Sequence, residues 1–267
     1  MLNLPKYFQP KFTSKLIRLG RNNDGGYVVS EDAIKASDSL YSFGLDDDWS
    51  FEKSFYALNN SKVYVYDSSV TLIYWIKKNI LNFRDLIFFK KNLKDFLKYI
   101  FIFFEYNYFF DNKKKFHIKK HVSSDRYIKN VKNKVNNEIN FKEIFNSENK
   151  NIFLKIDIEG NEYKILDDII KFQKRFTGIT IEFHSCDLMM DAIKFFLKNL
   201  KMDLIHLHVN NFSEITKKKI PTVIEMTFSK RKFNFKRKKK IKYPIKGLDQ
   251  PNDKRSSDKK INFKNIF

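Results

Sequence analysis

Several residue types and patterns are scarce in this chain of 267 residues, and each scarcity excludes something. One cysteine, Cys186, permits no internal disulfide and does not indicate an oxidising compartment. Residues 1–20 lack the apolar core of a signal peptide. The most apolar stretch, residues 99–110, is too short to cross a bilayer and contains Glu105 and Asn107. The expected compartment is therefore the cytoplasm.

Arginine is also rare, although the formal net charge is +21. The basic residues are overwhelmingly lysine, whereas arginine is the residue whose geometry suits phosphate and base recognition. Lysine, asparagine, isoleucine, phenylalanine and tyrosine are abundant together, as A/T-rich codons would produce. The charge therefore has two interpretations, a compositional bias or an anionic partner such as a membrane surface or a polyanionic substrate.

Short apolar strands alternate with segments of helical periodicity along most of the chain. This alternation predicts an α/β fold with a doubly wound, mostly parallel sheet. The last two predicted strands follow the final helix closely, which suits an antiparallel hairpin at one edge. Residues 16–30, with the turn Asn-Asn-Asp-Gly-Gly, predict a separate β-hairpin. The predicted sheet strands are residues 39–43, 63–66, 117–122, 152–158, 178–184, 202–209 and 222–228.

Two segments do not follow the repeating unit. Residues 82–116 are rich in Phe and Lys and are predicted to be a helical insertion, whose rings either belong to the core, stack on a ligand or lie on a membrane. Residues 229–267 are predicted to be a basic C-terminal extension, with the run Lys-Arg-Lys-Lys-Lys at 236–240. The remaining residues, 1–228, are predicted to form one domain.

Polar residues follow the predicted strands where parallel strands present their carboxyl ends. Such sheets bind ligands at that edge. The motif K-I-D-I-E-G-N-E-Y at 155–163 places Asp157 and Glu159 at a strand end, with Gly160 allowing a sharp turn into a helix. We expect these carboxylates to meet the polar residues that end the neighbouring strands, which are Gly44, Asp46, Asp67, Ser123, Asp125 and His184.

The strand ends predict a nucleoside ligand that lacks a buried pyrophosphate. Asp67 ends the second strand, where a carboxylate commonly binds the two hydroxyls of a ribose; a helix-capping role is the alternative. The first strand is followed by the single Gly44 where a dinucleotide fold has G-x-G-x-x-G, and the chain has no P-loop. S-adenosylmethionine fits these limits.

The chain resembles the FkbM-type methyltransferases, which use S-adenosylmethionine and have the class I Rossmann-like fold. The resemblance rests on residues 40–44, 65–67 and above all 154–163, with weaker similarity at 24–28, 181–184, 205–211 and 221–225. It covers most of residues 16–228. One departure is that the usual glycine-rich first loop is reduced to Gly44 followed by Asp46, Asp47 and Asp48.

The resemblance implies roles for several strand-end residues. Gly44 and its neighbour Asp46 would line the methionine end of the cofactor, and Asp67 its ribose. Ser123 would meet the adenine. Asp157 would act in the reaction or bind the amino group of the cofactor, and a helix-capping role is the alternative.

Transfer of a methyl group to an alcohol requires that the alcohol lose its proton to a base or bind a metal. Asp157 and His184 are the acid/base candidates, and Glu159 is placed with them or braces the turn at Gly160. His206 and His208 lie two apart on one strand and face the same way, with Asn210 at its end. These three residues are predicted to bind sugar hydroxyls. With Asp157, Glu159 or His184, the two histidines are also candidate ligands of a divalent metal; ordinary sheet histidines are the alternative.

The expected function is that of an O-methyltransferase that acts on a sugar hydroxyl of a surface polysaccharide or glycoconjugate. The substrate class follows from the resemblance. The expected location is the cytoplasm, with peripheral contact at an anionic inner membrane. Two alternatives stay open: a non-catalytic protein that binds nucleic acid on its basic surface, and a methyltransferase of RNA, against which the scarcity of arginine weighs.

Overall fold

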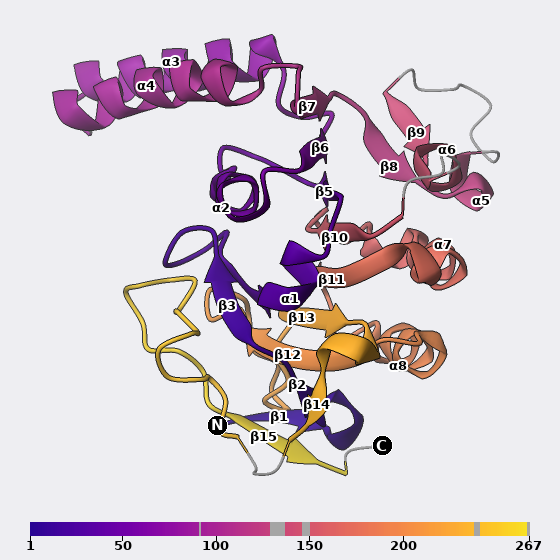
Figure 1. Ribbon diagram of the computed structural model, residues 1–267. Helices are drawn as coiled ribbons and strands as arrows, with labels where there is room; N and C mark the ends of the chain where they lie inside the picture. The colour runs from indigo at the N-terminus through magenta and orange to yellow at the C-terminus, as the bar shows by residue number, and fades with distance from the viewer. Residues whose placement is uncertain (91, 129–136, 146–149, 238–240, 266–267) are drawn as a thin grey trace.

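The computed structural model describes residues 1–90, 92–128, 137–145, 150–237 and 241–265. Seven strands form the central sheet in the order β12-β13-β11-β10-β5-β6-β7 (Figure 1). β13 is antiparallel to both of its neighbours, and the other pairs are parallel. The strands are β5 (Ser39–Phe43), β6 (Lys62–Tyr66), β7 (Lys115–Ile118), β10 (Ile152–Ile156), β11 (Phe176–Phe183), β12 (Asp203–Val209) and β13 (Ile224–Ser229).

This arrangement confirms the predicted α/β fold, a doubly wound Rossmann-like sheet that is mostly parallel and has an antiparallel hairpin at one edge. Every residue of β5, β10, β11 and β13 is buried. Because both faces of these strands are covered, their polar residues are buried as well, as Lys155 of β10 and Glu225 of β13 show.

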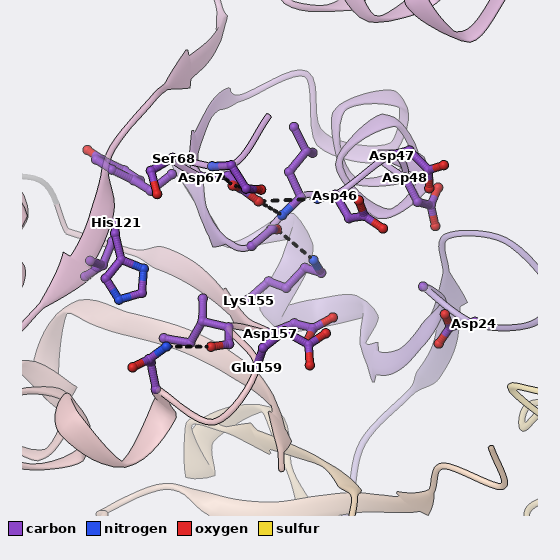
Figure 2. Close-up of a pocket in the computed structure, with 18 of the residues that line it drawn as sticks. Asp24, Asp46, Asp47, Asp48, Asp67, Ser68, His121, Lys155, Asp157 and Glu159 are labelled. Atoms are coloured by element: carbon purple, nitrogen blue, oxygen red, sulfur yellow. Dashed lines mark hydrogen bonds between the residues drawn. The ribbon is translucent and has the colours of Figure 1, made fainter. Parts of the chain in front are cut away.

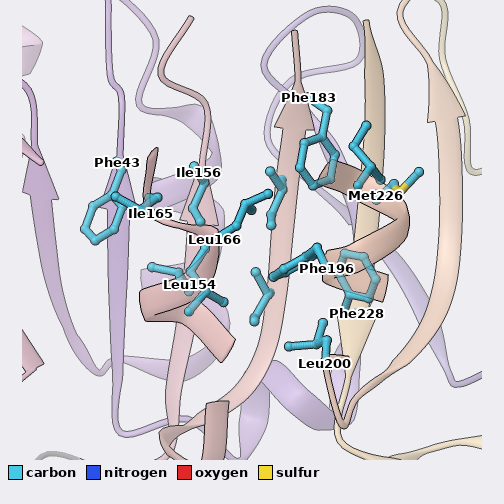
Figure 3. Packing of buried hydrophobic residues seen from close by; sticks show 14 of the residues in the cluster. Phe43, Leu154, Ile156, Ile165, Leu166, Phe183, Phe196, Leu200, Met226 and Phe228 are labelled. Atoms are coloured by element: carbon cyan, nitrogen blue, oxygen red, sulfur yellow. The ribbon is translucent and has the colours of Figure 1, made fainter. Parts of the chain in front are cut away.

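Helices cover both faces of the sheet and bury a separate core on each (Figure 1). The helices α1 (Glu31–Lys35) and α2 (Ser50–Asn59) cover one face, where Phe51 and Phe55 pack against Phe153. The helices α6 (Phe141–Phe145), α7 (Leu166–Phe172) and α8 (Met190–Asn199) cover the other. Figure 3 shows the second core, in which Phe196 of α8 packs between the strand residues Phe183 and Phe228.

The predicted N-terminal hairpin is present. β3 (Leu16–Leu19) pairs antiparallel with β4 (Tyr27–Ser30), and the connecting turn carries Gly20 and Gly25 at positive φ. β4 contacts β11 and β13, so Tyr27 is buried next to the ends of the central strands. Ser30 ends the hairpin and caps α1 by accepting a hydrogen bond from the Ala33 backbone.

The third strand of the sheet differs from its predicted bounds of 117–122. β7 begins at Lys115 and ends at Ile118, because the backbone turns at Lys120, whose N–H donates to the Ile118 carbonyl. The following β8 (His121–Ser123) pairs with β9 (Glu138–Asn140) in a separate two-stranded sheet, next to the short helix α5 (Asp125–Ile128). Lys115 and Phe116 therefore belong to the central sheet and not to the predicted insertion.

The predicted insertion is a pair of antiparallel helices, α3 (Leu72–Ile87) and α4 (Leu93–Phe109), between β6 and β7 (Figure 1). α3 has Thr71 as its N-cap and continues to Ile87, so it begins ten residues before the predicted start of the insertion at residue 82. We call α3 and α4 together the helical hairpin. None of the helices in the described part of the chain combines the length and apolarity needed to cross a bilayer.

The C-terminal segment folds back along the N-terminal one. β15 (Ile261–Lys264) pairs in parallel with β1 (Leu2–Pro5), and β14 (Phe235–Lys236) pairs with β2 (Phe12–Thr13). Residues 238–240 of the basic run lie outside the described residues. The division into a domain of residues 1–228 and an extension of residues 229–267 stays a prediction.

Candidate functional site

A cavity of about 430 Å³ opens at the carboxyl ends of β5, β6 and β10 (Figure 2). This is the edge at which doubly wound sheets bind their ligands. The structure brings five of the predicted residues to it: Gly44, Asp46, Asp67, Asp157 and Glu159.

The cavity is acidic although the chain is strongly basic. Its lining contains one arginine and one lysine, Arg21 and Lys155, and His121 is buried so that the pKa of its imidazole is lowered. A cavity with this excess of negative charge favours a cationic ligand and disfavours a polyphosphate. The seven carboxylates are those of Asp24, Asp46, Asp47, Asp48, Asp67, Asp157 and Glu159.

Gly44 is required where β5 and β10 meet. Its φ is +90°, and a Cβ built there would lie 1.7 Å from the Asp157 carbonyl oxygen. The Gly44 N–H donates to the Tyr66 carbonyl (3.0 Å), and the Asp157 N–H donates to the Phe43 carbonyl (2.9 Å). A side chain at position 44 would push these strand ends apart, so the glycine sets the floor of the cavity.

Asp67 lines the cavity, but its carboxylate is occupied by the protein itself. One oxygen accepts from the backbone N–H of Leu45 (2.8 Å) and Asp46 (3.3 Å), and the other accepts from the N–H and hydroxyl of Ser69 (2.7 and 2.6 Å). These bonds lower the Asp67 pKa although burial alone would raise it. Asp67 thus ties the loop after β5 to the loop after β6. The alternative role, in which Asp67 is the N-cap of the next helix, is wrong, because Thr71 is the N-cap of α3.

The turn after β10 places Glu159 at φ +52° and Gly160 at φ +93°, with the Glu159 side chain 84% exposed. Glu162, and not Glu159, braces this turn. The buried Glu162 carboxylate accepts from the N–H groups of Ile158 (3.1 Å) and Gly160 (3.2 Å). The same oxygen lies 3.0 Å from His184 Nδ1 and fixes the orientation of that ring.

His184 Nε2 lies 3.4 Å from Glu159 Oε2 and 3.9 Å from Asp157 Oδ1. Burial would lower the His184 pKa, but the bond to Glu162 and the surrounding carboxylates raise it to about 9. At neutral pH the ring therefore carries a proton and is not free to accept another.

Tyr27 connects Asp157 to a second buried acid, Glu182 on β11. The Tyr27 hydroxyl lies 2.9 Å from Asp157 Oδ2 and 2.9 Å from Glu182 Oε2. A hydroxyl has one hydrogen, so it can donate to only one of the two carboxylates. Burial and the charges of Asp157 and Glu225 raise the Glu182 pKa well above its usual value. A neutral Glu182 that donates to Tyr27, which in turn donates to Asp157, satisfies all three groups.

A second cavity, of about 870 Å³, adjoins the first and shares Arg21, Asp24, Asp157 and Glu159 with it. Asp157 therefore lies on the boundary between the two cavities. The wall of the second cavity is rich in amides and in charged groups of both signs, with one hydroxyl at Ser213 and a ring that is 70% exposed at Phe212. Its polar lining includes Asn23, Glu182, His184, Asn210, Ser213 and Asn252.

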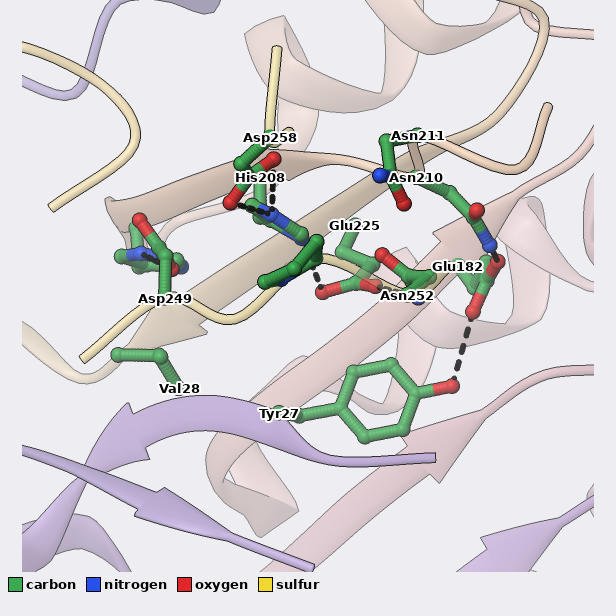
Figure 4. A network of polar contacts seen from close by, with 12 residues as sticks. Tyr27, Val28, Glu182, His208, Asn210, Asn211, Glu225, Asp249, Asn252 and Asp258 are labelled. Carbon is green, nitrogen blue, oxygen red and sulfur yellow. Dashed lines mark hydrogen bonds and ion pairs between the residues drawn. The ribbon is translucent and has the colours of Figure 1, made fainter. Parts of the chain in front are cut away.

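The C-terminal segment supplies one wall of this second cavity. Figure 4 shows His208 between Glu225 (3.2 Å) and Asp258 (3.0 Å), while Asn252 donates to Glu225 (2.9 Å). The sequence placed His206 and His208 at the substrate, with Asn210. Only Asn210 lines the cavity, where it donates to Glu182; the two histidines are each 2% exposed beneath the C-terminal segment.

Within the described residues, one group of side chains has ligand atoms close enough to hold a metal ion: Asp157, Glu159 and His184, within 4.8 Å of one another. The predicted pair His206 and His208 is not part of it; their ring nitrogens face carboxylates instead, with His206 Nε2 3.0 Å from Asp249 Oδ1 and His208 Nε2 3.0 Å from Asp258 Oδ2.

Ser123, predicted at the adenine, is 4% exposed in β8 and does not line the cavity. His121 and Val122 of the same strand do. The third strand explains this difference, because it ends at Ile118, four residues before the predicted end at 122, and the chain therefore passes the cavity before it reaches Ser123.

Sequence reasoning also missed the buried pair of Lys155 and Glu52. Lys155 Nζ lies 3.7 Å from Glu52 Oε1 and donates to the Gly44 carbonyl (3.3 Å), and both side chains are at most 5% exposed. Burial lowers the Lys155 pKa, but the charges of Glu52 and Asp157 raise it overall, so the amine stays charged. The feature of the sequence that could have indicated this pair is the lysine within the otherwise apolar run Ile152–Ile156.

Comparison with known proteins gives little beyond the fold. No family model matches the sequence, and no curated protein matches it. The precorrin-6y C5,15-methyltransferase of Geobacter metallireducens is 10% identical over 75% of this chain and 86% of its own, with a TM-score of 0.36. The fibrillarin pre-rRNA processing protein of Methanococcus jannaschii is 10% identical over 74% of this chain and 68% of its own, with a TM-score of 0.33. Similarity this low assigns no activity.

Proposed function

We propose that this protein is an S-adenosylmethionine-dependent methyltransferase that methylates a hydroxyl group, in keeping with its resemblance to the FkbM-type family. The observation that carries the proposal is the acidic cavity at the ends of β5, β6 and β10 in a chain of net charge +21. S-adenosylmethionine supplies a methyl group bonded to a positively charged sulfonium, and it also bears an ammonium group. Both cations suit this lining.

The dimensions and donor set of the cavity fit this cofactor. A volume of about 430 Å³ lies within the range of roughly 300–1,000 Å³ typical of sites for small molecules. Gly44 and Asp46 would line the methionine end, and His121 and Val122 the adenine. Asp67 would face the ribose, although its present bonds make its first role the positioning of the loops that surround the cofactor.

The acceptor would occupy the second cavity. Amides that donate and accept hydrogen bonds, carboxylates that accept them and basic groups that donate them, beside the exposed ring of Phe212, suit a polyhydroxylated molecule such as a sugar. This lining supports the proposed acceptor, a sugar hydroxyl of a surface polysaccharide or glycoconjugate.

Asp157 is the residue to which we assign the proton of the acceptor. It alone of the two acid/base candidates lines both cavities. Burial raises its pKa, although Lys155 and His184 act in the opposite direction, and a carboxylate of raised pKa is a better base. Protonated His184 would instead stabilise the negative charge that develops near Asp157. Tyr27 orients the Asp157 carboxylate through its hydrogen bond.

Calorimetry with S-adenosylmethionine tests the cofactor. We expect the wild type to bind at sub-millimolar concentration and Asp46→Asn to bind about fivefold more weakly, since one charge of the cavity is lost. Asp32→Asn is the matched control, because Asp32 is exposed and lies outside both cavities. Absence of binding by the wild type would refute the proposal, and equal losses in the two variants would refute the electrostatic argument.

Transfer of a labelled methyl group from S-adenosylmethionine tests the acceptor and the base. A panel of methyl glycosides and total RNA separates the sugar proposal from methylation of RNA. With an active glycoside, Asp157→Asn should lower the rate about 10²-fold or more while cofactor affinity stays within threefold. If RNA is labelled and no glycoside is, the acceptor is RNA and not a sugar. Loss of activity on chelation, restored by Mg²⁺ or Mn²⁺, would show that Asp157, Glu159 and His184 hold a metal.

A further inference from the structure

The helical hairpin extends from the body of the protein and exposes apolar side chains that no described part of the chain covers (Figure 1). Its base is anchored: Trp75 of α3 and Tyr106 of α4 are buried, and their ring centroids lie 6.4 and 5.7 Å from that of Trp49. Beyond this base the exposure is high. Among the described residues, 23 large hydrophobic side chains are exposed, and 14 of them lie between Leu72 and Tyr108.

Six of the seven exposed apolar residues described on α3 form one continuous stripe, and Leu81, 48% exposed, lies outside it. At 100° per residue, the six side chains fall within about 100° of one another around the helix. Each is between 49% and 63% exposed. The opposite side carries the buried Trp75 and Asn82. The stripe consists of Leu72, Ile73, Ile76, Ile80, Phe83 and Ile87.

A second stripe lies on α4, with residues between 41% and 87% exposed. Leu93, Leu97 and Phe101 line a shallow apolar groove between Lys94 and Lys98. Phe104 and Tyr108 continue the same side toward the base of the hairpin. Clusters of exposed apolar residues on this scale mark interaction surfaces.

Basic residues flank both stripes. The sequence from Leu72 to Phe109 has seven lysines and arginines against three acidic residues. Lys77 on α3, Lys90 at the tip, and Lys94 and Lys98 on α4 are exposed. Phe88 and Phe89 at the tip are 66% and 95% exposed. An apolar side bordered by lysine, with aromatic residues at its end, is the composition of helices that lie in the interface of an anionic bilayer.

We propose that the helical hairpin docks on an anionic lipid membrane, with the apolar stripes in contact with the lipid and the flanking lysines at the headgroups. Charge favours a membrane over a second copy of the chain as the partner of this surface. Two hairpins of the same sign on chains of net charge +21 repel each other, whereas anionic headgroups attract both.

The docking surface adjoins the two cavities. Lys98 of α4 lines the second cavity, and Lys78 of α3 pairs with Asp47, which lines the first. A membrane held by the hairpin would therefore lie near the proposed acceptor cavity, which suits an acceptor presented at the membrane surface. The docking itself does not depend on the proposed function, because its test involves neither cofactor nor acceptor.

Sedimentation of the full chain with vesicles tests the proposal. Vesicles of phosphatidylcholine with roughly 30 mol% phosphatidylglycerol should retain the wild type at about 0.1 M salt, and pure phosphatidylcholine should retain far less. Ile80→Ser/Phe101→Ser should lower the partition coefficient at least tenfold. Its matched control is Leu188→Ser/Phe195→Ser, which removes two exposed apolar residues outside the hairpin.

Lys77→Glu/Lys94→Glu should weaken binding to the anionic vesicles and reduce the dependence of that binding on salt. The control Lys217→Glu/Lys218→Glu changes two exposed lysines outside the hairpin and should have a smaller effect on both. Circular dichroism verifies that each variant is folded. Failure of the wild type to bind the anionic vesicles would overturn the proposal, as would equal retention of the Ile80/Phe101 variant and its control. Self-association that this variant abolishes, without vesicle binding, would assign the surface to a second copy instead.

Discussion

Replacement of Gly44 by alanine tests whether the contact between β5 and β10 builds the site. Alanine at φ +90° costs about 1–2 kcal/mol from backbone conformation alone. The added Cβ would also lie 1.7 Å from the Asp157 carbonyl oxygen, so the two strand ends must separate by more than about 1 Å. That shift strains the 2.9 Å hydrogen bond from the Asp157 N–H to Phe43, worth about 1 kcal/mol. With about 1–3 kcal/mol for the steric overlap itself, the sum is a loss of about 3–6 kcal/mol in the free energy of unfolding.

Gly160→Ala is the matched control. Gly160 has nearly the same φ, +93°, but a Cβ there would meet nothing within 4 Å. It should therefore lose only the conformational cost of about 1–2 kcal/mol. Urea denaturation followed by circular dichroism measures both variants, and calorimetry at low temperature measures whether the folded fraction binds S-adenosylmethionine. Equal stability of the two variants would refute the reasoning, because it would mean that the strand ends separate without cost.

Three further predictions concern buried charge. Lys155→Met should lower the free energy of unfolding by about 3–5 kcal/mol in urea denaturation, because Glu52 stays buried without its cation. Adding Glu52→Gln should recover most of that loss. Absence of recovery would contradict the pairing. Asp67→Ala should lower the free energy of unfolding by about 1–3 kcal/mol, since the backbone N–H of Leu45 loses its acceptor. An unchanged midpoint of urea denaturation would argue against the role of Asp67 in holding the two loops together. His184 binds its proton more tightly when folded, with a pKa of about 9 against about 6.5 unfolded, so its contribution to stability is complete below pH 6.5 and is lost as the pH rises through 9. Denaturation midpoints between pH 6 and 9.5 should show this decline, and His184→Gln should flatten it.

The features that were predicted correctly are local in the chain. The hairpin of residues 16–30, the alternation of strands and helices, and the turn at Gly160 each depend on residues a few positions apart. Convergence of Gly44, Asp67 and Asp157 followed from one topological rule about parallel strands. The end of the third strand was wrong because it depends on pairing with β6, and the basic residues at 119–120 gave no clear stop.

The amino-acid sequence alone determined the fold class, the edge of the sheet at which the polar residues converge, and the presence of Asp157 there. Only the tertiary structure decided that Tyr27 and Glu182 complete the surroundings of Asp157, that Lys155 is neutralised by Glu52, and that His206 and His208 are structural. It also decided that the apolar residues of the helical hairpin face outward. The physical reason is that each of these facts depends on contacts, or on their absence, between segments separated by tens to more than a hundred residues, which no local pattern records.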